Sequence, residues 1–244
     1  MQHEIFATED EAGARAAAII AETLAETPDL CLGLPTGMTP LPLYRHLVAR
    51  HRDQGLSFAR TRIFLVDEYL GMALTEQGSF VRFLKEHFLD HIDADPSRVH
   101  FPDALAADPD AEAKRYGDSI EAAGLDLVVL GVGPNGHVGF NEPGSAIDSP
   151  ARVVDLAPET IARAKSSMAP GRPVPTRGIT IGLETILESK AVLLIACGAA
   201  KSEPVRQLFS GGEIASWPVA ALASHAYLTV LMDRAAAPQN FTNG

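Results

Sequence analysis

The chain of 244 residues has few cysteines, few basic residues and no long apolar run. Cys31 and Cys197 both lie in apolar segments, so we expect buried thiols and no disulfide framework. The 31 acidic residues exceed the 20 basic ones and give a net charge of −11, which argues against a nucleic acid or an anionic membrane as partner. No apolar run reaches the roughly 18 residues of a spanning helix, and the first residues lack the charged start and apolar core of a signal peptide. These absences predict a cytoplasmic protein.

Metal-ligand spacings and a nucleophile elbow are missing as well. No group of histidine, cysteine and acidic residues has the spacing of a zinc or calcium site. Neither Ser145 nor Ser149 lies in the turn that activates a serine nucleophile. We therefore expect no metal, no redox cofactor and no acyl transfer.

Apolar strands and amphipathic helices alternate along the chain, and 46% of its residues are hydrophobic, enough for a full core. Strands are expected at 30–34, 61–66, 125–132, 178–181, 191–197 and 226–233. Helices are expected at 11–26, 41–50, 80–92, 110–123, 183–188 and 201–209. This alternation predicts a single α/β domain over 1–244, with a Rossmann-like, open, mostly parallel sheet and helices on both faces. Residues 144–175 contain five prolines and break the pattern, and we interpret them as a lid or an oligomer contact.

The apolar strand at 125–132 ends in a glycine-rich turn that carries Asn135, His137 and Glu142. Ligands of open α/β sheets bind beyond the carboxyl ends of the strands. A histidine can take and return a proton near neutral pH, and a neighbouring carboxylate can hold one tautomer. A lone histidine is often structural, but four glycines around His137 favour a catalytic role.

Two other strand ends carry candidate groups. Asp67 directly follows the strand at 61–66 and would serve as a general base if burial raised its pKa, the alternative being a helix cap or solvated turn. The turn after the strand at 30–34 offers backbone N–H groups and two hydroxyls to a phosphate. Its residues are Thr36, Gly37, Met38 and Thr39. The alternative is an ordinary connection capped by Thr39, because the turn is neither a Walker loop nor a complete G-x-G-x-x-G motif.

Three cations complete the candidate site: Arg152, Lys165 and Lys201. Lys201 stands at the start of an expected helix, where the helix dipole disfavours a cation unless an anion binds nearby. For Lys165 a solvated surface position is the stronger alternative. The residues alone thus predict a small anionic ligand beside a proton-transfer site.

Four segments, taken in chain order, resemble the glucosamine-6-phosphate deaminase (isomerase) family: LPTGMTP at 34–40, VDEYLG at 66–71, GVGPNGHVGFNEP at 131–143 and ITIG at 179–182. The resemblance runs from about residue 5 to 235. The related 6-phosphogluconolactonases share the glycine–histidine part of the third segment but lack the FNEP that follows it.

This resemblance implies conversion of glucosamine 6-phosphate and water to fructose 6-phosphate and ammonium, without a cofactor. It implies that His137 opens the sugar ring with support from Asn135 and Glu142, and that Asp67 moves a proton between C2 and C1. It also implies that the turn at 36–39 and Lys201 hold the phosphate. Lys165 stands where many members carry an arginine, and it lacks the bidentate fork of that side chain.

Two departures from the family pattern have consequences. Some members carry aspartate where this chain has Asn135, so the pH optimum is expected to differ. Allosteric members bind N-acetylglucosamine 6-phosphate with an arginine and a lysine two residues later, but Val153 and Val154 follow Arg152 here. We therefore expect no activation by that ligand.

Two other functions remain open at this stage. One is lactone hydrolysis, which would not need Asp67 for carbon-acid chemistry. The other is a sugar-phosphate sensor of a transcription regulator, against which stand the intact set of Asp67, His137 and Glu142 and the absence of a DNA-binding module. The sequence leaves open glucosamine against galactosamine 6-phosphate, and monomer against homo-oligomer.

Overall fold

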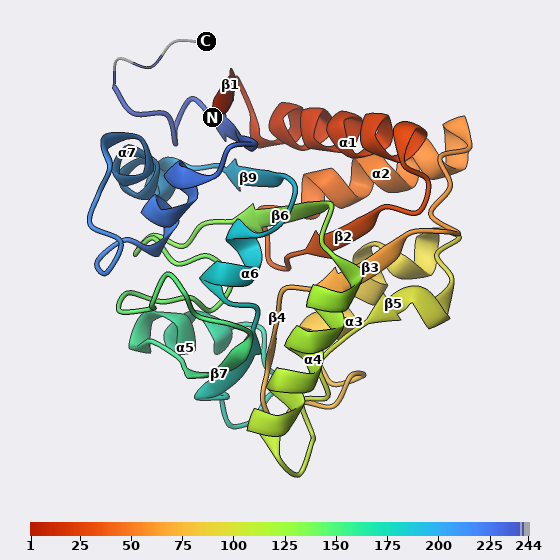
Figure 1. Ribbon diagram of the computed structural model, residues 1–244, viewed down its shortest axis with the longest axis vertical. Coiled ribbons are helices and arrows are strands. Elements are labelled where there is room, and N and C mark those ends of the chain that lie inside the picture. The colour runs from red at the N-terminus through yellow and green to blue at the C-terminus, as the bar shows by residue number, and fades with distance from the viewer. Residues whose placement is uncertain (240, 242–244) are drawn as a thin grey trace.

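The computed structural model describes residues 1–239 and 241 and forms one α/β domain around a seven-stranded, wholly parallel sheet (Figure 1). The strand order is β1-β10-β9-β6-β2-β3-β5. The strands are β1 (Gln2–Phe6), β2 (Cys31–Leu34), β3 (Arg62–Leu65), β5 (Val99–His100), β6 (Leu127–Gly131), β9 (Val192–Ala196) and β10 (Leu228–Asp233). The predicted sheet is confirmed, and β1 and β5 at its edges were not expected from the sequence.

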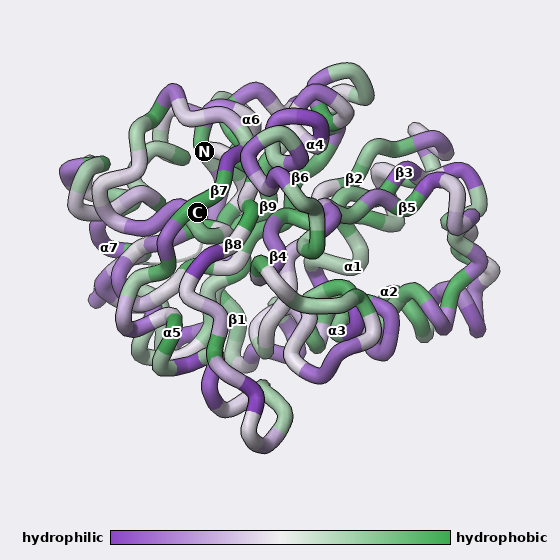
Figure 2. The backbone as a smooth tube through the Cα atoms, turned by 90° about the horizontal axis from the view of Figure 1, so that it is seen from below, coloured by the Kyte–Doolittle hydropathy of each residue, from purple (hydrophilic) through white to green (hydrophobic). Residues whose placement is uncertain are grey.

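Helices cover both faces of this sheet, as predicted. Along β6 the side chains of Leu127 and Val129 join one apolar cluster and those of Val128 and Leu130 the other, because successive side chains of a strand point to opposite faces. The first cluster lies under α1 (Glu9–Glu26), α2 (Leu41–Gln54) and α3 (Phe80–His87). The second lies under α4 (Pro109–Ala123), α6 (Leu183–Leu187) and α7 (Ser202–Ser210). Figure 2 shows hydrophobic stretches along the interior strands and hydrophilic ones around the periphery.

Close packing of the helices follows from small residues. Gly13 lies in the middle of α1, where a Cβ would stand 2.4 Å from Cβ of Pro42 at the start of α2. A glycine inside a helix costs conformational entropy, and here it lets the two helices approach. None of the helices in the described part of the chain is long and apolar enough to cross a membrane.

A second, antiparallel sheet with the order β4-β8-β7 lies beside the first. It consists of β4 (Asp67–Tyr69), β7 (Arg152–Asp155) and β8 (Arg177–Thr180). The strand expected at 178–181 thus belongs to this sheet and not to the parallel one. Val66 connects the two sheets, because its N–H donates to the carbonyl of Leu34 and its carbonyl accepts from Ile181 N–H.

The expectation that 144–175 is irregular is corrected in part, because this segment contains β7 and the helix α5 (Pro158–Ala164). Its prolines mark boundaries of elements. Pro158 occupies the first position of α5, where no backbone N–H is needed, and Pro150 precedes β7. The helix expected at 80–92 is also shorter: α3 ends at His87, and Leu89–His91 forms a separate 3-10 turn.

Candidate active site

Four loops that carry the candidate residues follow neighbouring strands of the parallel sheet. They follow β9, β6, β2 and β3, which are adjacent in that order, so their carboxyl ends meet at one edge (Figure 1). The chain proceeds from β2 outward through β3 and returns beside β2 as β6, which makes this a topological switch point. Segments far apart in the sequence therefore meet where ligands of such sheets bind.

His137, Asn135 and Glu142 form one hydrogen-bonded cluster in the loop after β6. Nδ1 of His137 lies 2.6 Å from Oδ1 of Asn135 and 3.2 Å from Oε2 of Glu142, and Nδ2 of Asn135 donates to the same Oε2 at 2.8 Å. Because an ionised carboxylate only accepts, the Asn135 amide must turn its nitrogen to Glu142 and its oxygen to His137. The proton of neutral His137 is thereby placed on Nδ1, which leaves Nε2 available to a substrate.

Glu142 is held in its ionised form. Burial by itself would raise its pKa, but hydrogen bonds from His137, Thr160 and Asn135 outweigh burial and lower the pKa to about 2. The Thr160 hydroxyl, on α5, donates to Oε1 of Glu142. Helix α5 thus contacts the catalytic loop through a residue that was not selected from the sequence.

Two glycines of this loop are required by what lies against them. A Cβ at Gly133 would stand 2.2 Å from Cε1 of His137, so any other residue would displace the ring. Gly139 has a φ of +56°, and a Cβ there would lie 2.9 Å from Oγ1 of Thr180 and 3.7 Å from Oδ2 of Asp67. Gly139 is therefore where the histidine loop meets Asp67.

Asp67 begins β4 and pairs with Thr180 of β8. It is 7% exposed, and neither of its carboxyl oxygens accepts a hydrogen bond from the described residues. Burial, and then the charge of Glu68, raise its pKa to about 8. Burial thus raises the pKa of Asp67, as a general base requires. A helix cap or a solvated turn would not leave the carboxyl buried and without hydrogen-bond donors.

The turn at 36–39 presents unused donors between β2 and α2. In the described part of the chain, its four backbone N–H groups donate no hydrogen bond. Gly37 has a φ of +102° with open space around it, and Met38 is 77% exposed. The N-cap of α2 is Pro40, without a side-chain bond, so Thr39 does not cap the helix as the alternative required. The turn retains the donors that an anion needs.

Lys201 lies at the N-cap of α7, as the sequence predicts, and its Nζ donates to the carbonyl of Val132 at 2.5 Å. Burial, and then the Arg163 guanidinium, lower the pKa of Lys201 to about 8. The charge of Arg163 thus disfavours the charge of Lys201, and a bound anion would offset that repulsion. Arg163 was not selected from the sequence, because no helix was expected at 158–164. Thr160 and Arg163 are three residues apart, a spacing that places both on one face of a helix and would have indicated Arg163.

Lys165 and Arg152 occupy different surroundings. Lys165 follows α5, is exposed, and makes no side-chain hydrogen bond or ion pair with the described residues. Arg152 donates to Oδ1 of Asn141 at 2.9 Å and to Oγ of Ser145 at 3.0 Å. Asn141 is fully buried beside Glu142. Arg152 therefore holds the loop after β6 in place through these two hydrogen bonds.

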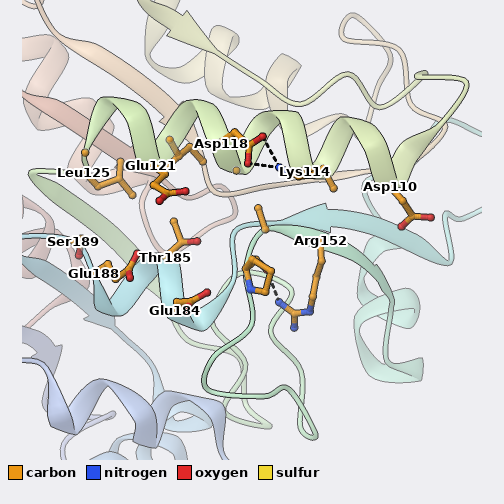
Figure 3. A pocket seen from close by; sticks show the side chains of 16 residues that line it. Asp110, Lys114, Asp118, Glu121, Leu125, Arg152, Glu184, Thr185, Glu188 and Ser189 are labelled. Atoms are coloured by element: carbon orange, nitrogen blue, oxygen red, sulfur yellow. Dashed lines mark hydrogen bonds and ion pairs between the residues drawn. The ribbon is translucent and has the colours of Figure 1, made fainter.

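A separate cavity of about 530 Å³ lies between α4 and α6 (Figure 3). None of the candidate catalytic residues lines it. Its labelled charged side chains are mostly acidic, and Lys114 is occupied by an ion pair with Asp118. A phosphate would meet repulsion there, so the cavity is no alternative to the site at the sheet edge.

Comparisons with known proteins agree with this geometry. Residues 6–231 match the family model of glucosamine-6-phosphate isomerases/6-phosphogluconolactonase. The chain is 41% identical over 230 residues to a glucosamine-6-phosphate deaminase of Bacillus velezensis, covering 93% of this chain and 95% of that protein. It is 40% identical over 232 residues to glucosamine-6-phosphate deaminase 1 of Bacillus subtilis, covering 94% and 96%.

Solved structures include a monomeric glucosamine-6-phosphate deaminase, with a TM-score of 0.94 at 38% identity over 97% of this chain and 98% of that chain. A 6-phosphogluconolactonase of Leishmania guyanensis has a TM-score of 0.80 at 21% identity over 99% of both chains, which shows a shared fold alone. With the family model covering nearly the whole chain and relatives near 40% identity, this protein belongs to the family of glucosamine-6-phosphate isomerases and 6-phosphogluconolactonases.

Proposed function

We propose that this enzyme is a glucosamine-6-phosphate deaminase, which converts glucosamine 6-phosphate and water to fructose 6-phosphate and ammonium. The observation that carries the proposal is the buried, unbonded carboxyl of Asp67 against the loop of His137. A proton acceptor of raised pKa next to a histidine of fixed tautomer suits an aldose–ketose isomerisation. The names of the relatives near 40% identity support the choice of an amino sugar phosphate.

Ring opening is assigned to His137. Its Nε2 takes the proton of the C1 hydroxyl while the bond between C1 and the ring oxygen breaks, and it returns a proton to that oxygen. Glu142 stays ionised throughout and stabilises the transient imidazolium through Nδ1. Asn135 keeps both groups aligned by bridging them.

Isomerisation and deamination are assigned to Asp67. The ionised carboxylate removes the proton from C2, and the electron pair of that bond forms the C1–C2 double bond of an enolamine. The carbonyl electron pair moves to the C1 oxygen, which takes up a proton from water. Asp67 then delivers the proton to C1, which leaves an imine at C2. Water adds to C2, and the carbon–nitrogen bond breaks to release ammonia, which is protonated to ammonium. No cofactor enters any of these steps.

The substrate phosphate is assigned to the unused N–H groups of the turn at 36–39 together with Lys201 and Arg163, whose charges interact. A bound dianion would remove the repulsion between these two cations and return the pKa of Lys201 toward its ordinary value. Lys165, which the sequence offered for this role, is the weaker candidate because its charge, unlike that of Arg163, does not act on the pKa of Lys201.

The test is to measure ammonium and fructose 6-phosphate formed from glucosamine 6-phosphate. Galactosamine 6-phosphate and 6-phosphogluconolactone are run in parallel, the first for selectivity and the second for hydrolase activity. We expect turnover of the amino sugar, reduced at least about 10²–10⁴-fold in Asp67→Asn while ligand binding persists. Lactone hydrolysis at an undiminished rate in Asp67→Asn, with no ammonium from either amino sugar, would replace the deaminase by a hydrolase.

A further inference from the structure

Glu68, the neighbour of Asp67 on β4, is a buried carboxylate that the mechanism above does not use. It is 1% exposed, and its two oxygens accept four hydrogen bonds. Oε1 accepts from the N–H groups of Tyr69 at 2.8 Å and Phe80 at 3.0 Å. Oε2 accepts from the Ser79 hydroxyl at 2.7 Å and Val81 N–H at 2.9 Å. Among the described residues, no lysine, arginine or histidine forms an ion pair with it.

These partners favour a charge on Glu68. Three of them are backbone N–H groups, which cannot accept, so a proton on Glu68 would have to displace one of these donors or reverse the hydrogen bond with the Ser79 hydroxyl. Phe80 and Val81 belong to the first turn of α3, where the helix dipole also favours an anion. Burial raises the pKa of Glu68 above its ordinary value, and the hydrogen bonds from Val81, Phe80 and Ser79 offset part of that rise.

Asp67 has the contrary surroundings. Its oxygens receive no hydrogen bond from the described residues, although it is nearly as buried as Glu68. When one of two adjacent buried carboxyls must carry a proton, the one without donors takes it. Glu68 is therefore the fixed charge of the pair and Asp67 the group that titrates.

Three tyrosines also interact with the charge of Asp67: Tyr69 of β4, Tyr44 of α2 and Tyr116 of α4. The loop that carries His137 and Glu142 approaches Asp67 at Gly139. Burial raises the pKa of all three tyrosines above its ordinary value, so their side chains are neutral near neutral pH. Glu142 and His137 neutralise each other as an ion pair when the histidine is charged. The neighbouring charge that raises the pKa of Asp67 is that of Glu68.

We propose that Glu68 is a positioning residue for Asp67, a fixed buried charge clamped by the first turn of α3 that makes its neighbour a stronger base than burial alone would. This inference rests on the proposed function, in which Asp67 removes the C2 proton. Through the same hydrogen bonds Glu68 ties β4 to α3 and keeps Asp67 at the edge of the sheet.

The test compares kcat/KM against pH for wild type, Glu68→Gln and Ser79→Ala. Both variants lose a hydrogen bond at the start of α3, and Glu68→Gln alone loses the charge. Removing that charge lowers the pKa of Asp67, so we expect the acid limb to move to lower pH by about one unit in Glu68→Gln. We expect the limb to stay in place in Ser79→Ala. Equal midpoints in wild type and Glu68→Gln would overturn the proposal.

A second measurement does not depend on the stability of Glu68→Gln. Carbon-13 NMR of labelled carboxyls in the wild-type enzyme, with Asp67→Asn for assignment, reports which of the pair titrates. We expect Asp67 to titrate above pH 6 and Glu68 to remain ionised there. Titration of Glu68 in that range, with Asp67 ionised, would overturn the proposal.

Different results would overturn the proposed function and the proposed role of Glu68. If Asp67→Asn keeps wild-type turnover of the amino sugar, Asp67 is not the base and the inference about Glu68 is wrong. If the wild-type enzyme forms no ammonium from either amino sugar, the proposed function is wrong. If Asp67→Asn is inactive while the acid limb of Glu68→Gln stays at the wild-type midpoint, the deaminase stands and Glu68 has only a structural role.

Discussion

At the scale of single residues, the pKa values of two buried carboxyls in the candidate site are shifted in opposite directions. Burial and the charge of Glu68 raise the pKa of Asp67 to about 8. Glu142 is also buried, but its three hydrogen-bond donors lower its pKa to about 2. Such a separation divides the work between a group that moves protons and a group that holds charge. The division arises from the number of donors around each carboxyl.

The raised pKa of Asp67 predicts a pH-dependent cost to stability. An unfolded aspartate has a pKa near 4, so between about pH 4 and pH 8 the folded state binds more protons than the unfolded state. Stability therefore falls as pH rises through this window. At pH 8 we expect Asp67→Asn to have a free energy of unfolding higher than that of wild type by about 1 kcal/mol or more, and therefore to unfold at a higher temperature. At pH 5 we expect the difference between the two proteins to be smaller.

Thermal unfolding at both pH values checks this prediction. Asp29→Asn serves as the control, because Asp29 is exposed and its substitution should leave the pH dependence unchanged. A difference between wild type and Asp67→Asn that is the same at pH 5 and pH 8 would contradict a raised pKa in the folded state.

The two interacting cations that we assign to the substrate phosphate predict a graded loss of affinity. We expect Lys201→Met and Arg163→Met each to raise the KM for the sugar phosphate about 10- to 100-fold, because each loses a charge-assisted contact. Lys165→Met is the matched comparison from the same segment and should change KM less than about threefold. A larger effect at Lys165 than at Arg163 would return the role to the residue chosen from the sequence.

At the scale of elements, the loop after β6 depends on glycines for space more than for flexibility. Gly131 ends β6 in the sheet, and a Cβ there would meet nothing within 4 Å. A Cβ at Gly133 would strike the His137 ring. The same residue type two positions apart thus serves two different purposes, and the number of glycines alone does not reveal which of them supports catalysis.

This difference predicts unequal effects of the same substitution. We expect Gly133→Ala to reduce kcat at least about 100-fold, because the displaced imidazole no longer reaches the substrate, with a circular dichroism spectrum like that of wild type. Gly131→Ala should stay within about threefold of the wild-type kcat. Steady-state kinetics of the two variants decides, and equal activities would show that the ring tolerates the displacement.

At the scale of the whole molecule, the second sheet carries both Asp67 and the arginine that holds the loop after β6. Arg152 at the start of β7 donates to Asn141 and Ser145 of the catalytic loop, while Asp67 lies on β4 of the same sheet. This brace is already in place within one chain. A ligand would gain little by ordering a loop that Arg152 already holds.

We therefore expect N-acetylglucosamine 6-phosphate to leave the rate unchanged at subsaturating substrate. We also expect Arg152→Met to lower kcat and the unfolding temperature without any ligand, because Asn141 loses a buried partner. Initial rates with and without the ligand test the first statement. A rise in rate on its addition would show that a second binding site couples to the loop.

Much of the fold and site could be predicted because local patterns carry them. Apolar runs and helical periodicity located most strands of the parallel sheet, and Asn135, His137 and Glu142 lie within one loop whose strand points to the ligand edge. The proximity of Asp67 to that loop followed from parallel strands ending on one side. Helix α5 and Arg163 were missed, because a seven-residue helix between prolines has too little periodicity to stand out.

What the sequence determined by itself is a mostly parallel sheet and the residue types at the ends of its strands, since strand period, turn composition and residue type are properties of neighbouring residues. Only the tertiary structure decided that the chain crosses to a second sheet at Val66, that Arg152 donates to Asn141, and that the charge of Arg163 acts on Lys201. It also decided which carboxyl is buried without donors and which is satisfied. Those outcomes depend on pairing between distant segments and on exclusion of water, and neither is encoded in any one stretch of the chain.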